Sequence, residues 1–288
     1  MIGVRLQGRL GNQLFQYAFI YSTAKTLGEA FLLDQHIERL IIAEYFVLRP
    51  GLSGWLSRRI FSIKGYKNLF SYRLRILIYS HTSMLFKHFV SYPFDISPME
   101  VSLQKNTFYQ GYFQSCSFFE PYTSEIKDLF KIKRKYAELY ISRFSDILEG
   151  HRVVTVHIRR QDYQNFLGND ITLPMEYYHK VLRMINEPNA LYILISDEPA
   201  LVKEEFSYLK NVLISEELEI TDFQHLLRAD ICVIANSTFS WWGAFLNQNP
   251  SKKVYAPQHF LGWREQKEIP IDIYPSSWNI VSFLNKTK

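Results

Sequence analysis

The sequence predicts an α/β protein whose C-terminal half is a doubly wound parallel sheet. From residue 153 onward, short apolar runs rich in β-branched residues alternate with helix-length segments, which is typical of a buried parallel sheet. A similar strand, turn and helix begin at residue 2. The 288 residues, 47% hydrophobic and 16% aromatic, are enough to bury a sizeable core, and this composition excludes a disordered chain.

The C-terminal half contains predicted strands and helices in regular alternation. The strands are the apolar runs at 153–158, 191–195, 212–214, 231–235 and 254–256. The helices between them occupy 176–186, 200–206, 222–228 and 238–247. In sheets of this kind ligands bind at the carboxyl ends of the strands, so we expect a site there.

The N-terminal half is less regular. A β-α-β unit is predicted from a strand at 2–6, a helix at 12–27 that ends at Gly28, and a strand at 31–33. A further strand at 108–113 and amphipathic helices at 117–131 and 134–148 follow, and no element is assigned within 35–106. We expect an N-terminal domain of residues 1–150 and a C-terminal domain of residues 151–288.

Positive charge is concentrated in one segment. The chain has 33 Lys and Arg against 28 Asp and Glu, a net charge of +5. Residues 45–94 include eight basic residues and no acidic one, so the rest of the chain carries −3. The eight are Arg49, Arg58, Arg59, Lys64, Lys67, Arg73, Arg75 and Lys87. Two interpretations stay open: a solvated basic face above core residues, or a surface that contacts an anionic membrane.

The number of cysteines and the length of the apolar runs argue against several classes of protein. Cys116 and Cys232 are the only cysteines, which excludes a disulfide scaffold and argues against a thiolate zinc site. No apolar run approaches the roughly 18 residues of a spanning helix, and the N-terminus does not have the pattern of an export signal. We therefore expect a cytoplasmic protein, with membrane contact at most peripheral.

Two adjacent arginines, Arg159 and Arg160, follow the first C-terminal strand, with Asp162 next to them. Arginines at a strand end are suited to phosphate oxygens, but an Arg–Asp ion pair that caps the strand is an equally good interpretation. His157, within the strand, fits either a ligand contact or a satisfied core histidine.

Asn236, Ser237 and Thr238 follow a second strand and open a helix. One of them is sufficient as a helix cap, and three together favour an anion at the helix N-terminus. Arginines and amides at neighbouring strand ends would form a diphosphate clamp. Asp197 and Asp222 also follow strands and could either bind a base or ribose or cap a helix.

Several common motifs do not occur. The turn QGRLGNQ at 7–13 opens a helix but is neither G-x-G-x-x-G nor a P-loop, which argues against dinucleotide and P-loop sites. There is no Asp-x-Asp pair or H-E-x-x-H, and the eight histidines are scattered. We therefore expect neither a metal nor a cofactor.

Three segments together resemble the bacterial α-1,2-fucosyltransferases of glycosyltransferase family 11. They are GRLGNQLFQYA at 8–18, VHIRRQDY at 156–163 and ANSTFSWWGA at 235–244. The shorter pieces QGYFQS at 110–115, SDE at 196–198 and YPSSW at 274–278 also look like this family. Gln161 departs from the family, which usually has glycine there, and residues 35–106 match it poorly.

The resemblance implies a GT-B-like fold of two Rossmann-type halves with the donor held by the second. It implies inverting transfer of L-fucose from GDP-β-L-fucose to the 2-hydroxyl of a terminal galactose, through an oxocarbenium-like transition state. Arg159 then corresponds to the arginine that contacts the β-phosphate, and the spacing of Asp222 and Asp230 assigns guanine to Asp222. On the sugar or acceptor side the resemblance places Gly11, Asn12, Gln13, Tyr112 and Gln114.

The general base is left open: Asp162 either accepts the acceptor proton or orients the arginines, and an oxocarbenium electrophile needs little help from a base. Alternatives of other classes are a non-catalytic nucleotide-sugar or anion-binding module and a nucleic-acid binder. Neither predicts a strand-end clamp together with the N-terminal turn, so we expect GDP-fucose and a glycan, not nucleic acid, as partners. Among enzymes, the alternative is a fucosyltransferase that forms another linkage.

Overall fold

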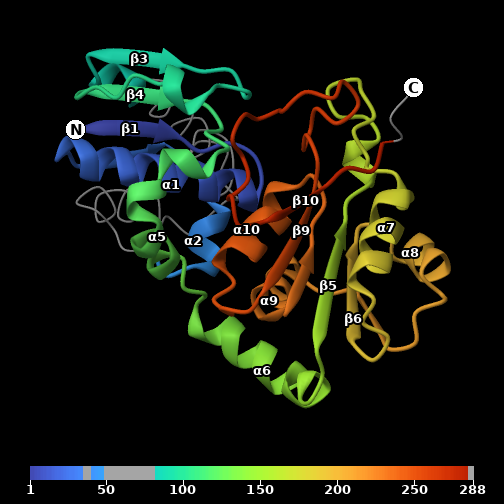
Figure 1. The fold of residues 1–288 in the computed structure, drawn as a ribbon. Coiled ribbons are helices and arrows are strands. Elements are labelled where there is room, and N and C mark those ends of the chain that lie inside the picture. The colour runs from blue at the N-terminus through green and yellow to red at the C-terminus, as the bar shows by residue number, and fades with distance from the viewer. Residues whose placement is uncertain (35–39, 49–81, 285–288) are drawn as a thin grey trace, which may run out of the picture. The chain divides into compact units, whose positions relative to one another are not determined.

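The computed structural model describes residues 1–34, 40–48 and 82–284. Of the eight basic residues between 45 and 94, only Lys87 is among them, so the predicted membrane surface lies outside the described residues. The chain divides into two compact units, described separately below (Figure 1). Unit 1 comprises Met1–Ile132 and Pro270–Ile273, and unit 2 comprises Lys133–Ile269 and Tyr274–Lys288.

Unit 1 contains a four-stranded parallel sheet in the order β2-β1-β4-β3. Its strands are β1 (Ile2–Arg5), β2 (Phe31–Asp34), β3 (His88–Ser91) and β4 (Thr107–Gln110). Its helices are α1 (Leu10–Leu27), α2 (Ile41–Tyr45) and α5 (Thr123–Leu129), with short 3-10 turns at Thr82–Leu85, Pro98–Glu100, Cys116–Phe118 and Glu120–Tyr122. Gly28 ends α1 in the left-handed conformation, φ 64°, and its N–H donates to the last turn.

Helix α1 packs against β1 and β2, and aromatic contacts also join it to β4 and the residues that follow β4. Phe19 stacks on Phe113 with ring centroids 3.7 Å apart and meets Tyr109 edge to face at 5.3 Å. All three side chains are fully buried. Burial on this scale contributes about 2–3 kcal/mol for each ring, which fixes α1 and its N-terminal turn against the sheet.

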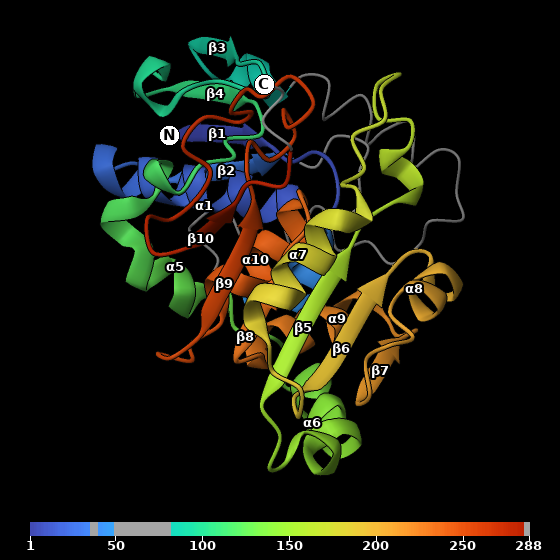
Figure 2. The same cartoon turned by 45° about the vertical axis from the view of Figure 1, so that its right-hand side comes forward.

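Unit 2 contains a six-stranded parallel sheet in the order β10-β9-β8-β5-β6-β7. The strands are β5 (Val153–Ile158), β6 (Leu191–Ser196), β7 (Val212–Ser215), β8 (Ile231–Val233), β9 (Lys253–Pro257) and β10 (Asn279–Val281). The helices are α6 (Arg134–Leu148), α7 (Met175–Ile185), α8 (Pro199–Glu205), α9 (Glu219–Arg228) and α10 (Thr238–Leu246), with a 3-10 turn at Gln161–Tyr163. Helices α7 and α8 cover one face and α9 and α10 the other (Figures 1 and 2).

The two helix layers follow from the strand order. The chain moves outward from β5 to β6 and β7, and then crosses back to β8 on the other side of β5. Right-handed crossovers in opposite directions place their helices on opposite faces. On one of these faces α9 and α10 pack closely at Gly243, where an added Cβ would lie 2.6 Å from the Leu226 Cβ.

The predicted alternation of unit 2 is confirmed, with small changes at the element ends. The strand predicted at 231–235 stops at Val233, and the sixth strand, β10, was not predicted because it has three residues and two of them are exposed. The predicted domain boundary lies after residue 150, whereas contacts place α6 in unit 2 because it packs on α9 through Tyr140, Phe144 and His225.

For unit 1, the ends of β1 and β2 differ from the prediction by one residue, and three larger differences occur. The strand predicted at 108–113 ends at Gln110, because Gly111 follows and Phe113 has φ 52°. The helix predicted at 117–131 is two 3-10 turns followed by α5, because Pro121 interrupts the hydrogen-bond pattern. Helix α1 begins at Leu10, two residues earlier than predicted. Across both units, no described helix is long and apolar enough to cross a membrane.

Candidate functional site

The candidate site of unit 2 lies where the strand order reverses, at the carboxyl ends of β5 and β8. The two strands are paired through Val156 and Val233, so the segments that follow them begin side by side. Strand β6 pairs with β5 on its other edge and brings a third strand end to the same place. The reversal of strand order in an open parallel sheet is where such proteins bind nucleotides.

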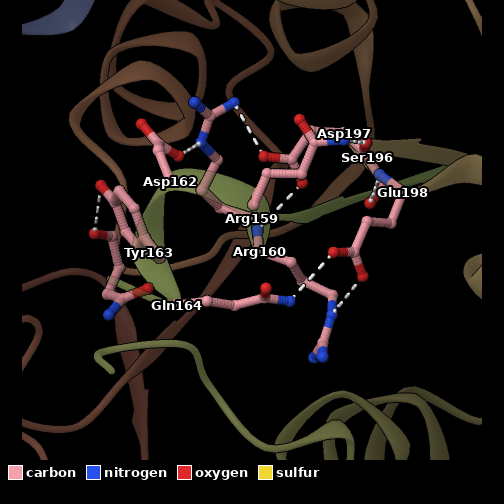
Figure 3. Close-up of polar contacts among 10 residues, drawn as sticks. Arg159, Arg160, Asp162, Tyr163, Gln164, Ser196, Asp197 and Glu198 are labelled. Atoms are coloured by element: carbon pink, nitrogen blue, oxygen red, sulfur yellow. Dashed lines mark hydrogen bonds and ion pairs between the residues drawn. The ribbon is translucent and has the colours of Figure 1, made fainter. Parts of the chain in front are cut away.

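Arg159 directly follows β5 and is held by two carboxylates (Figure 3). Its Nε pairs with the Asp162 Oδ1 at 2.7 Å and its Nη1 with the Asp197 Oδ2 at 3.2 Å. Burial lowers the pKa of Arg159, but the two carboxylates outweigh it and the pKa is raised. The guanidinium is thus charged at every working pH.

Asp197 follows β6 and anchors both arginines. Its Oδ1 accepts the backbone N–H of Arg160 at 2.9 Å, while its Oδ2 faces Arg159. Gln161, the departure from the family pattern, donates from Nε2 to the Asp197 carbonyl at 2.5 Å. Asp197 therefore binds the loop after β5 that contains Arg159 and Arg160, called the arginine loop below. The sequence left two interpretations of Asp197 open, a base contact or a helix cap, and neither predicted this arrangement.

Arg160 points away from Arg159 and pairs with Glu198 (Figure 3). Its Nε donates to the Glu198 Oε2 at 2.7 Å, and the Gln164 Nε2 donates to the Oε1 of the same carboxylate at 3.0 Å. The two adjacent arginines thus have different surroundings: Arg159 faces the strand ends, and Arg160 is part of an ion pair in the loop.

The segment 236–238 lies between β8 and the first turn of α10. Asn236 is fully buried; its Nδ2 donates to the Ile171 carbonyl at 2.8 Å, and its Oδ1 has no hydrogen-bond partner among the described residues. Ser237 is the N-cap residue, and in the described part of the chain its side chain makes no capping hydrogen bond. The first N–H groups of α10, beginning at Thr238, form the positive end of the helix.

His157 is a core residue in this structure. It is 5% exposed, its ring lies 5.4 Å from that of Phe239, and its Nδ1 has no hydrogen-bond partner among the described residues. Burial, together with the nearby charge of Arg159, lowers the pKa of His157 to about 3. The imidazole is therefore neutral at physiological pH and adds no positive charge to the site.

Asp222 lies in the first turn of α9 and accepts a hydrogen bond from the Ser215 hydroxyl at the end of β7. Burial raises the pKa of Asp222 to about 7, and the charges of Glu217 and Glu219 act in the same direction. Asp230, which is eight residues further on, fixes the other end of the sheet by accepting the Val153 N–H at 2.8 Å. These two aspartates therefore occupy opposite ends of the sheet.

The predicted sugar-side residues belong to unit 1. Gln114 donates from Nε2 to the Asn12 Oδ1 at 2.9 Å, and its buried Oε1 has no hydrogen-bond partner among the described residues. Gln13 is 1% exposed, and its amide bonds to backbone at Gly8 and Ile41, which gives it a structural task. Gly8 has φ 74°, and an added Cβ would collide with the Asn12 side chain.

Gly11 and Tyr112 flank these contacts. Gly11 is buried in the first turn of α1, and Tyr112 is half-buried beyond the end of β4. Within the described residues, no three or more His, Cys, Asp and Glu side chains are grouped as a metal site would require.

Several residues of the site were not predicted from the sequence: Tyr163, Gln164, Ser196, Glu198 and Ser215. Tyr163, Ser196 and Glu198 lie inside segments that resemble the family, and Ser215 directly follows the strand predicted at 212–214. Their position at strand ends was a usable signal. Their partners come from distant parts of the chain and could not be inferred from local sequence.

Comparison with solved structures identifies the class of fold. The structure is similar to the α-1,6-fucosyltransferase NodZ co-crystallised with GDP, at 13% identity over 85% of this chain and 92% of that one, with a TM-score of 0.52. It is also similar to POFUT1 in complex with GDP, at 13% identity over 88% and 97%, with a TM-score of 0.53. The fold is GT-B-like, as predicted.

Residues 1–282 match the model of glycosyl transferase family 11, and the chain belongs to this family. Two relatives from Escherichia coli extend over nearly the whole chain. The O-antigen biosynthesis glycosyltransferase WbnK is 26% identical over 93% of this chain and 97% of its own length. An α-1,2-colitosyltransferase is 25% identical over 96% and 98%. The resemblance inferred from the motifs is thus confirmed, and the protein is a glycosyltransferase with a fucosyltransferase-like fold.

Proposed function

We propose that this protein transfers L-fucose from GDP-β-L-fucose to the 2-hydroxyl of a terminal galactose, with inversion at the anomeric carbon. One observation carries the proposal: the charged guanidinium of Arg159 is held by Asp162 and Asp197 at the point where the strand order reverses. Arg159 follows β5, and β5 pairs with β8, the strand that leads into α10. Family membership and the α-1,2 linkage in the name of one relative support the linkage.

Arg159 and the start of α10 are proposed to hold the diphosphate. Cleavage of the fucose–phosphate bond leaves negative charge on GDP, and fixed donors aimed at the β-phosphate stabilise that charge as it develops. The two carboxylates restrain the guanidinium before the donor arrives, so little reorganisation is needed at the moment of reaction. This arrangement supplies the counter-charge from the protein, so we propose that transfer requires no metal ion.

Asp162 is proposed to orient Arg159. Its Oδ1 is the partner of the Arg159 Nε at 2.7 Å, so the carboxylate is engaged with the guanidinium. If Asp162 were the general base instead, Asp162→Asn would abolish the rise of kcat with pH. Under the orienting role, the pH profile keeps its shape while kcat falls, because the amide still accepts one hydrogen bond but loses the charge.

Asp222 is proposed to bind guanine, whose N1–H and N2 amino group both donate. An ionised carboxylate accepts two such donors, and the raised pKa makes ionisation near pH 7 part of binding. On the sugar side, Asn12 and Gln114 are the proposed contacts, because the Gln114 Oε1 is buried with no partner in the described chain.

The deciding experiment measures GDP release from GDP-fucose in the presence of lactose and then determines the linkage of the product. We expect a 2-O-fucosyl galactoside in the presence of EDTA. A parallel reaction with GDP-activated colitose tests the donor suggested by the name of the second relative. Tight GDP binding without turnover on any galactoside would favour a binding module, and a product joined at another position would replace the α-1,2 assignment.

A further inference from the structure

The loop between β5 and α7 is tied to the start of α10 by a closed ring of three hydrogen bonds. The Tyr163 hydroxyl donates to the Asn236 carbonyl at 3.2 Å. The Asn236 Nδ2 donates to the Ile171 carbonyl at 2.8 Å, and the Ile171 N–H donates to the Tyr163 carbonyl at 2.9 Å. Because the ring is closed, none of the three residues can shift without lengthening two of its hydrogen bonds.

Tyr163 also contacts the proposed phosphate-binding arginine. The Arg159 guanidinium carbon lies 5.9 Å from the centre of the Tyr163 ring, within the range of a cation–π contact. The Tyr163 N–H donates to the Arg160 carbonyl at 2.8 Å, which completes the tight turn after β5. One side chain thus meets Arg159 with its ring and the residue before the α10 N-cap with its hydroxyl (Figure 3 shows the Tyr163 ring beside this arginine loop).

The ring of hydrogen bonds is anchored to the rest of unit 2. The Ile171 carbonyl accepts a second hydrogen bond, from the Trp263 Nε1 at 3.1 Å. Asp170, its neighbour, pairs with the Arg264 Nη2 at 2.8 Å and accepts the Thr172 N–H at 2.9 Å. The tie therefore fixes Tyr163 and the start of α10 to each other and to the segment after β9.

We propose that Tyr163 is a positioning residue that sets the separation between Arg159 and the N-terminus of α10. This inference rests on the proposed function, in which these two groups hold the diphosphate. The phenol itself need not touch the donor. Its effect passes through Arg159 and Asn236, and it acts on the β-phosphate, the part of the donor that bears the developing charge.

Tyr163→Phe tests this role, because it removes the hydroxyl and keeps the ring. The matched control is Tyr192→Phe, which removes an equivalent bond, from the Tyr192 hydroxyl to the Glu187 carbonyl at 2.9 Å, near the opposite end of the sheet. Titration calorimetry with GDP and with GMP, together with kcat, KM and the thermal midpoint, is measured for wild type and both variants. GMP lacks the β-phosphate, so the ratio of the two affinities reports on the proposed geometry.

We expect Tyr163→Phe to weaken GDP by about fivefold, the effect of one misplaced hydrogen bond, and GMP by less than about twofold. We expect kcat to fall about tenfold, because alignment affects the transition state most. Tyr192→Phe should leave the GDP/GMP ratio and kcat at wild-type values. Equal losses for GDP and GMP, or a lower thermal midpoint with unchanged kcat, would overturn the positioning role. If wild type binds neither nucleotide, the proposed function itself fails.

Discussion

Replacement of Arg159 by alanine tests the proposed mechanism most directly. The side chain is 20% exposed and pairs with both Asp162 and Asp197. Loss of one preorganised donor to a developing negative charge costs about 3–4 kcal/mol, or a factor of 10² to 10³ in kcat. We therefore expect kcat to fall to between about one-hundredth and one-thousandth of the wild-type value.

The surroundings of Arg159 add a second effect. Asp197 is 13% exposed, and without its cationic partner it becomes a nearly buried, uncompensated carboxylate beside the site proposed for a diphosphate. Arg159→Ala should therefore also weaken GDP. The double variant Arg159→Ala/Asp197→Asn should recover part of this affinity, because the repelling charge is gone, but none of the lost kcat, because nothing replaces the guanidinium.

The assay is GDP release under saturating donor, with GDP affinity from calorimetry and folding checked by thermal denaturation. Arg183→Ala is the matched control, since Arg183 forms an exposed ion pair with Glu176 on α7, away from the strand ends. Its kcat should equal that of wild type. An Arg159→Ala protein that retains more than about one-tenth of wild-type kcat would refute the reasoning, because that loss is smaller than removal of one such donor causes.

Three further predictions concern single residues. Because burial raises the pKa of Asp222 to about 7, GDP affinity should strengthen from pH 6 to pH 8 as the carboxylate ionises. Calorimetry should show that Asp222→Asn loses this part of the pH dependence. Parallel pH profiles of GDP affinity for wild type and variant would contradict a guanine contact. Burial lowers the pKa of His225 to about 4 from 6.5, so the unfolded state binds the extra proton. The free energy of unfolding should therefore drop by about 1.5 kcal/mol between pH 6.5 and pH 5 from this group, a loss that urea titration should find absent in His225→Phe. Gly243→Ala places a Cβ 2.6 Å from Leu226 and should destabilise unit 2 by about 1–3 kcal/mol in calorimetric melts; an unchanged melting temperature would mean that α9 moves away freely.

Predictions from sequence were accurate where local pattern and environment agree. The strand at 153–158 is predicted to the residue, because five of its six residues are β-branched and such a run is typical of a strand buried on both faces. Gly28 ends α1 as predicted, because glycine readily adopts the left-handed conformation. The prediction failed at 117–131, where Pro121 and tertiary packing replaced a continuous helix with short turns.

The candidate site shows the same contrast between features that local sequence predicts and features that tertiary packing decides. Sequence placed Arg159 and Asn236 at strand ends, and the pairing of β5 with β8 confirms that those strands are neighbours. It could not decide whether Asp197 faces a ligand or another side chain, since its partner Arg159 is 38 residues away along the chain. The ties from Ile171 to Trp263 and Asn236 span still longer separations.

By itself, the sequence determined the α/β class, the alternation of unit 2, the family and the residue types at the strand ends. These depend on periodicity, on conformational preference and on short motifs, all of which are local. Only the tertiary structure decided that Arg159 is restrained by two carboxylates, that Arg160 pairs with Glu198, and that Tyr163 joins the arginine loop to α10. The physical reason is that strand order and crossover direction select which strand ends become neighbours, and only neighbouring ends bring distant side chains within hydrogen-bonding distance.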